Sequence, residues 1–147
     1  MLDTNVYDRI VADEAFLTKL IKAHNDGKIV VLETHVQRDE LARISDDAKR
    51  ALVKRVPGVK IVTSGMVWDV SRFDEGTFGD GAGDVCVSDL LTPAGNSAQD
   101  ALITATSSYA ADVLVTEDKR IPKRVRATNS KLAVWNFDRF KAYVEAL

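Results

Sequence analysis

The sequence predicts one α/β domain in which a central, mainly parallel sheet lies between two layers of helices, a three-layer α/β/α sandwich. Two observations predict this fold. Short runs rich in Val, Ile and Leu alternate along the chain with longer segments of helical periodicity. Runs of this composition are expected for strands that helices cover on both faces, and such alternation favours parallel strands joined by right-handed crossovers.

Strands are predicted where a short segment is rich in Val, Ile and Leu and has no helical period. Five segments are expected to contribute to the sheet. The first has only two residues, so it is inferred from its context and not from a pattern. The five segments are residues 1–2, 28–32, 59–63, 112–116 and 131–135.

Helices are predicted between these strands and after the last one. In the first helix, Phe16 and Leu20 lie on one apolar stripe, and Asp13 is placed to cap the N-terminus. The second helix is expected to end at Pro57-Gly58. The four predicted helices are residues 13–24, 46–56, 97–111 and 137–147.

The composition fits a single domain over residues 1–147. The chain is 46% hydrophobic and 29% charged, with a net charge of -2 and a pI of about 5.7, so any nucleic-acid contact is expected to be a local patch. The single cysteine, Cys86, forms no internal disulfide and has no companions at zinc-ligand spacing. Because the sequence lacks a signal peptide and an apolar run near the roughly 20 residues of a membrane span, we expect a cytoplasmic protein with no membrane partner.

Four acidic residues each lie at or just beyond the point where an apolar run stops or a helix begins: Asp3, Glu40, Asp100 and Asp118. A buried carboxylate is costly unless a positive charge lies beside it, so acids at the edges of core segments indicate a cation partner. Because the carboxyl ends of parallel strands meet at one edge of a sheet, Asp3 and Asp118 are expected to lie close together. Oxygen ligands without imidazole or thiolate favour Mg²⁺ or Mn²⁺ over zinc.

Four short motifs around these acids occur in a fixed order. They are Leu2-Asp3-Thr4-Asn5-Val6, Glu40-Leu41, Asp100-Ala101-Leu102-Ile103 and Val113-Leu114-Val115-Thr116-Glu117-Asp118. Each motif alone is weak, but together and in this order the chain resembles the PIN domain family of nucleases over essentially its full length. The resemblance implies a metal-dependent ribonuclease that hydrolyses phosphodiester bonds of single-stranded RNA. The VapC-type toxins of toxin–antitoxin pairs are the most numerous small bacterial members of that family.

The resemblance also implies roles for individual residues. Asp3, Asp100 and Asp118 are expected to bind Mg²⁺ or Mn²⁺ directly or through water, and Glu40 is expected to bind the ion or to orient the attacking water. Hydrogen bonds that fix these carboxylates or the substrate phosphate are expected from three polar residues: Asn5, Thr116 and, one turn before Asp100, Asn96. An antitoxin partner and a homodimer are options that the sequence leaves open.

A basic run follows Asp118 and provides the expected contact with single-stranded or structured RNA. It comprises Lys119, Arg120, Lys123, Arg124 and Arg126. These side chains are placed to bind phosphates beside the acids. The alternative interpretation is a solvated loop that offsets the local negative charge. Trp68 and Phe73 are expected in the core, because Val67, Val70 and Phe73 have helical spacing.

Structural interpretations of the four acids stay open at this point. Asp3 is also a suitable N-cap for a helix near Val6, Asp100 and Asp118 are acids at helix starts, and Glu40 is also an ordinary solvated helix residue. Correspondingly, the alternative to the nuclease is a PIN-like scaffold that binds RNA or a protein without cutting. A phosphoacceptor receiver domain fits less well, since the first strand lacks paired acids. The glycine-rich segment 74–84 is expected to be a loop, and whether it orders on binding stays open.

Overall fold

The computed structural model describes residues 1–77, 87–90, 98–128 and 130–147. Asn96 and residues 78–84 of the glycine-rich segment therefore lie outside the described residues. The strands are β1 (Leu32–Glu33), β2 (Val59–Lys60), β3 (Val113–Val115) and β4 (Ala133–Trp135). The helices are η1 (Thr4–Val6, a 3-10 turn), α1 (Tyr7–Ala12), α2 (Glu14–Asn25), α3 (His35–Ala42), α4 (Asp47–Val53), α5 (Val87–Leu90), α6 (Ala98–Ala110), α7 (Ile121–Ala127) and α8 (Phe137–Glu145).

The strands pair in parallel, as the alternation of elements predicted. β1 pairs with β2, with Leu32 opposite Val59, and β3 pairs with β4. The N-terminal segment adds a parallel bridge between Leu2 and Val115 on the other edge of β3. The two residues inferred as a first strand are therefore held against β3 by a strand-like contact.

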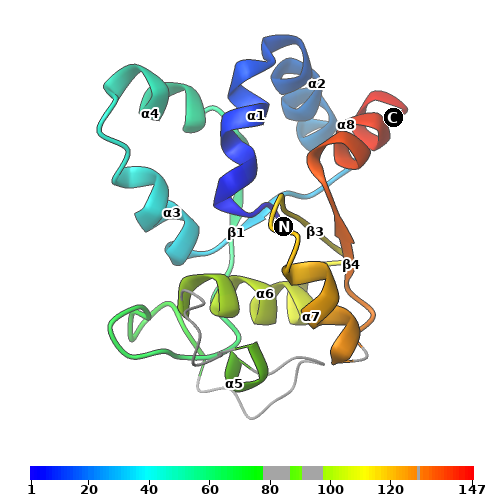
Figure 1. Cartoon of the computed structure of the whole chain (residues 1–147). Helices are drawn as coiled ribbons and strands as arrows, with labels where there is room; N and C mark the ends of the chain where they lie inside the picture. Colours follow the sequence, from blue (N-terminus) through cyan, green and yellow to red (C-terminus); the bar gives the residue numbers. More distant parts are fainter. Residues whose placement is uncertain (78–86, 91–97, 129) are drawn as a thin grey trace.

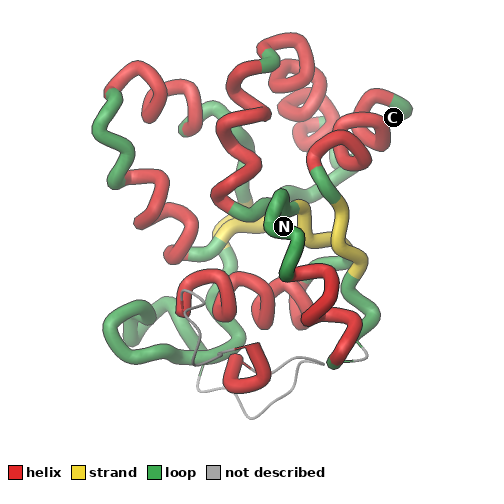
Figure 2. Tube along the Cα trace, in the orientation of Figure 1, coloured by secondary structure: helices red, strands yellow, loops and turns green. Residues whose placement is uncertain are grey.

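Side chains along the strands alternate between two hydrophobic clusters. Leu2 and Val115 belong to a cluster with residues of α1, α2 and α8, whereas Met1 and Leu114 belong to one with residues of α6 and α7. Figure 1 shows α1, α2 and α8 on one side of the strands and α6 and α7 on the other. Figure 2 shows the same arrangement, with the yellow strands between red helices. Both faces of β3 are thus covered, which explains why Val113–Val115 are all apolar, whereas both residues of β2 are exposed.

The fold is mixed α/β with parallel strands, which confirms the predicted class at that level. Within the described residues the strands form two separate two-stranded sheets, β1 with β2 and β3 with β4. The single continuous sheet of the predicted three-layer sandwich is therefore not formed by these residues. None of the helices in the described ranges has the length and apolar composition that a membrane crossing requires.

The predicted helices are present and their caps explain where they begin. The carboxylate of Asp13 accepts a hydrogen bond of 3.0 Å from the Phe16 amide at the start of α2. Asp46 does the same for the Lys49 amide at the start of α4, also at 3.0 Å. Each cap satisfies a backbone donor that has no partner within the helix.

The predicted strand over residues 28–32 is shorter than expected and starts later. Gly27 adopts a positive φ of 70° after α2, and the Lys28 and Ile29 amides bond back to the Ala23 carbonyl. This helix-end geometry uses the backbone donors that a strand would need. Pairing begins at Val31, whose carbonyl accepts a hydrogen bond from the Val59 amide.

The prediction that Trp68 and Phe73 pack in the core is wrong. Their side chains are 90% and 78% exposed, although Val67 and Val70 do pack against the core. The helical spacing misled because residues 64–77 form turns and bridges and not a helix. In this segment Asp69 has a φ of 64°, a conformation incompatible with a continuing helix.

Candidate functional site

The N-terminal segment brings Asp3 against the end of β3. The Asp3 amide donates to the Val115 carbonyl at 2.9 Å, and the Val115 amide donates to the Met1 carbonyl at 3.0 Å. This pairing places Asp3 beside Thr116, 113 positions later in the chain. The Asp3 side chain is buried, with 3% exposure.

A hydrogen-bond network fixes the Asp3 carboxylate. Its Oδ2 atom accepts one bond from the Thr116 hydroxyl at 2.6 Å and another from the Asn5 amide at 2.7 Å. The Thr116 hydroxyl in turn accepts a bond from the Asp118 amide at 3.0 Å, and Asn5 Oδ1 accepts one from the Glu117 amide at 3.1 Å. Asn5 and Thr116 therefore both donate hydrogen bonds to the Asp3 carboxylate.

The electrostatic surroundings of Asp3 disfavour its charged form. Burial raises the pKa of Asp3, and the negative charges of Asp100 and Glu40 raise it further, although the Thr116 hydrogen bond lowers it. A buried carboxylate close to two more acids carries a cost that an added cation would remove. The structure thus brings three of the four acids into one electrostatic group.

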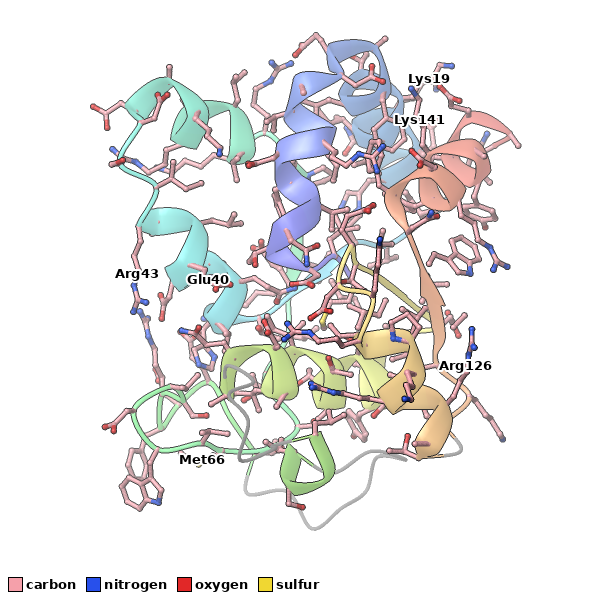
Figure 3. The ribbon with its side chains drawn as sticks, viewed as in Figure 1. Lys19, Glu40, Arg43, Met66, Arg126 and Lys141 are labelled. Carbon is pink, nitrogen blue, oxygen red and sulfur yellow. The ribbon has the colours of Figure 1, made fainter. Side chains whose placement is uncertain are left out.

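Glu40 lies on α3 (Figure 3), and its Oε2 atom is buried without a hydrogen-bond partner in the described part of the chain. A solvated helix residue would expose this oxygen to water. A buried carboxylate oxygen without a donor instead calls for a partner that supplies positive charge. The unpartnered oxygen therefore favours the interpretation of Glu40 as one of the cation-binding acids over its interpretation as a solvated surface glutamate.

Gln37 is a residue that the sequence reasoning missed. Its side chain is fully buried, its Oε1 atom accepts bonds from the Thr34 amide at 2.6 Å and the Thr34 hydroxyl at 2.8 Å, and its Nε2 atom donates to the Leu2 carbonyl at 2.5 Å. Gln37 thus ties the start of α3 to the residue before Asp3. The pattern Thr34-x-x-Gln37 matches a capping box and was the available signal.

Asp100 lies in the first turn of α6, so its position also suits a helix-start acid. Its charge raises the pKa of Asp3 on one side and contributes to the raised pKa of Arg120 on the other. Asp100 therefore lies within electrostatic reach of both Asp3 and the segment after β3.

Asp118 is the acid whose surroundings differ most from expectation. Its carboxylate is held by Arg120, with Nε at 2.9 and 3.0 Å from the two oxygens and Nη2 at 2.6 Å from Oδ2. The Arg120 amide adds a bond of 2.8 Å to Oδ1. Mainly because of the Arg120 hydrogen bond, the pKa of Asp118 is lowered. Arg120 was expected to contact RNA, and here it contacts an expected metal ligand.

The other basic residues of the run lie on or beside α7. Lys119, Lys123 and Arg126 are exposed and Arg124 is half-buried. Figure 3 shows Arg126 at the outer edge of the molecule. Because Ile121–Ala127 form a helix, the alternative interpretation of this run as a loop is wrong, but its exposed cations are solvated and accessible to phosphate.

The donor set suits Mg²⁺ or Mn²⁺ in its chemistry. The four acids offer oxygen atoms alone, and the orphaned Glu40 Oε2 is a carboxylate oxygen of the kind these ions prefer. Among the residues that the structure describes, however, no three His, Cys, Asp or Glu side chains are grouped so that they could hold an ion as they stand. Asp118 would have to break its contact with Arg120 before it could bind an ion together with the other acids.

A second polar cluster lies elsewhere in the molecule and contains another buried acid, Glu75, which is 9% exposed. Its Oε1 atom is 2.8 Å from Lys60 Nζ and 3.8 Å from Arg72 Nη1, and its Oε2 atom is 3.7 Å from Nδ1 of the buried His35. These residues border a pocket of about 740 Å³ beside α3 and α4 that none of the four acids lines. Since its acid is already paired with cations, this cluster offers less to an added metal ion.

Comparisons with known proteins add no further information. No protein-family model matches the chain, and neither a curated protein nor a solved structure matches it. The resemblance to the PIN family therefore depends on the four sequence motifs alone.

Proposed function

We propose that this chain is a metal-dependent endoribonuclease with a PIN-like three-layer fold, which hydrolyses single-stranded RNA with Mg²⁺ or Mn²⁺. One observation carries the proposal. Asp3 is buried among like charges while Thr116 and Asn5 hold its carboxylate in one orientation. Perturbed acids that are fixed in this way are typical of sites that bind a cation or move a proton.

The proposed roles follow from these positions. Asp3 and Asp100 hold the ion with Asp118, and Glu40 binds it or orients the attacking water. Thr116 and Asn5 keep Asp3 in place through their hydrogen bonds. A bound Mg²⁺ or Mn²⁺ supplies a water of lowered pKa and neutralises charge on the phosphate oxygens.

Single-stranded RNA is the proposed substrate because cations and aromatic rings are both exposed. Lys119, Lys123 and Arg126 follow Asp118 in the sequence, and their exposed side chains are available to phosphates. Trp68 and Phe73 present rings to solvent, where unpaired bases can stack on them. A cytoplasmic toxin restrained by an antitoxin is the proposed biological role, and it predicts a short upstream reading frame for a DNA-binding partner.

The test compares RNA cleavage by Asp3→Asn and Asp118→Asn with cleavage by the unmodified protein in Mn²⁺. We expect each variant to lose at least about 100-fold in rate while staying folded, because an amide binds a divalent ion far more weakly than a carboxylate does. Asp26→Asn is the matched control, since Asp26 is an exposed acid paired with Lys22. Retained activity in both site variants would exclude the proposed mechanism.

The second candidate function is a PIN-like scaffold that binds RNA or a protein without cutting. The contact between Arg120 and Asp118 favours it, because that contact neutralises Asp118 without any metal. An Mn²⁺ titration with single-stranded RNA separates the two functions. Tight RNA binding with no product at any Mn²⁺ concentration would establish the scaffold.

A further inference from the structure

Arg120 is placed where it can act on both the acids and a substrate. Its side chain is 61% exposed, yet its guanidinium contacts both oxygens of Asp118, whose side chain is 16% exposed. An arginine whose guanidinium binds a carboxylate while most of its side chain is exposed to solvent can exchange that carboxylate for another partner without disturbing the core.

The contact between Arg120 and Asp118 occupies the coordinating atoms of the acid. Nε approaches both carboxylate oxygens and Nη2 takes the second oxygen at 2.6 Å. A carboxylate held in this way presents its lone pairs to the guanidinium, so a divalent ion must displace Arg120 before Asp118 can bind it. Asp100 also acts on the Arg120 charge, so the guanidinium is a shared counter-charge for two of the four acids.

We propose that Arg120 is an internal competitor of the divalent ion for Asp118 and that, once displaced, it binds the RNA phosphate next to the ion. This inference rests on the proposed nuclease function. It assigns one side chain two successive partners, a carboxylate in the metal-free protein and a phosphate in the substrate complex. Both partners suit the planar, bidentate geometry of a guanidinium.

The proposal gives one substitution two effects of opposite sign. Arg120→Ala frees Asp118, so Mn²⁺ should bind about fivefold more tightly, in keeping with the modest strength of a half-exposed ion pair. The same change removes a phosphate ligand, so single-stranded RNA should bind about tenfold more weakly in the presence of Mn²⁺. A purely structural role for Arg120 would move both affinities in the same direction or leave both unchanged.

The experiment measures Mn²⁺ binding by isothermal titration calorimetry and oligonucleotide binding by fluorescence anisotropy. The probe is a 2′-O-methyl single-stranded oligonucleotide that a gel shows to be uncut. Arg139→Ala is the matched control, because Arg139 is an exposed arginine of α8 that stacks on Trp135 and belongs to neither the four acids nor the basic run. It should leave Mn²⁺ affinity within about twofold. Arg120→Lys keeps the positive charge but lacks the bidentate guanidinium. Its affinities for Mn²⁺ and for the oligonucleotide should therefore fall between those of the unmodified protein and those of Arg120→Ala.

The outcomes separate this inference from the function on which it rests. Tighter Mn²⁺ binding together with weaker oligonucleotide binding in Arg120→Ala supports the inference. If the unmodified protein binds Mn²⁺ and Arg120→Ala binds it equally or more weakly, the inference is wrong and the nuclease proposal stands. If neither protein binds Mn²⁺, the proposed function itself is overturned.

Discussion

Two buried acids in this molecule have opposite surroundings. Glu75 is close to Lys60, Arg72 and His35, and the hydrogen bond from Lys60 is the main reason that its pKa is lowered. Asp3 lies within electrostatic reach of Asp100 and Glu40, and its pKa is raised mainly by burial and further by those like charges. Neighbouring cations therefore stabilise the charged form of Glu75, whereas the surroundings of Asp3 destabilise its charged form.

The different surroundings of Glu75 and Asp3 indicate that the two acids have different roles. A buried acid with cations beside it has its charge balanced within the chain, although Glu75 Oε2, like Glu40 Oε2, has no hydrogen-bond partner in the described residues. We expect Glu75 to contribute to the stability of the fold. A buried acid among other acids is costly in the free protein, and that cost persists where function requires an external cation. The following predictions test this contrast between Asp3 and Glu75.

The largest effect is expected from Thr116→Val. This change keeps the shape of the side chain but removes the hydroxyl that donates to Asp3 and accepts from the Asp118 amide. We expect a loss of about 2 kcal/mol in the free energy of unfolding and of about 10- to 100-fold in RNA cleavage. Chemical denaturation and a cleavage assay measure the two effects. Thr18→Val, which alters an exposed hydroxyl bonded to the Glu14 carbonyl, should change neither appreciably.

A smaller effect is expected at the Glu75 cluster. Lys60→Met removes the ammonium that lies 2.8 Å from Glu75 and should lower the free energy of unfolding by about 1 kcal/mol, because the Lys60 side chain is partly exposed. Cleavage of RNA should not change. Lys22→Met, which breaks an exposed pair with Asp26, is the control and should cost less. Equal losses of unfolding free energy in the two variants would show that the ion pair between Lys60 and Glu75 stabilises the fold no more than an exposed ion pair does.

The contrast predicts the opposite sign for Asp3→Asn. Measured with a chelator at neutral pH, this variant should be more stable than the unmodified protein by about 1 kcal/mol, the scale of a typical stabilising substitution. The amide keeps an oxygen that can accept the Thr116 hydrogen bond and removes the buried charge. A clear loss of stability would show that Asp3 is a structural acid like Glu75.

The stabilisation by Asp3→Asn should depend on pH. Because the folded-state pKa of Asp3 is raised, the folded protein binds this proton more tightly than the unfolded chain does. The contribution of Asp3 to stability therefore falls as pH rises from the unfolded-state pKa of about 4 through the raised value. Thermal unfolding of both proteins across this window should show their difference disappearing in acid. A difference that grows in acid would contradict the assigned direction.

The sequence predicted the individual helices and strands better than it predicted how many residues of each strand pair within a sheet. Helix α2 and its cap at Asp13 follow from local pattern, and the parallel pairing follows from alternation. Local pattern does not determine how many residues of a strand find a partner, so β1 is shorter than predicted. Trp68 and Phe73 were misplaced for a related reason, since helical spacing does not guarantee a helix.

At the candidate site, the contacts that depend on strand ends were predictable. Asp3, Asn5 and Thr116 meet because two parallel segments end at the same edge. The contact of Arg120 with Asp118 was not anticipated, since a basic run beside an acid fits both an ion pair and a phosphate site. The sequence pattern at Gln37 indicates only a helix cap, so the bond from its side chain to the Leu2 carbonyl was not predictable, and Asn96 lies outside the described residues.

The most direct test of the contrast is the effect of Mn²⁺ on thermal unfolding of three proteins: the unmodified chain, Asp3→Asn and Glu75→Gln. A ligand at 100 times its Kd stabilises the folded state by about 2.7 kcal/mol, enough to raise the unfolding temperature by several degrees. We expect this rise in the unmodified protein and in Glu75→Gln, and no rise in Asp3→Asn. An equal rise in Asp3→Asn, or no rise in the unmodified protein, would contradict the assignment of Asp3 to a metal site.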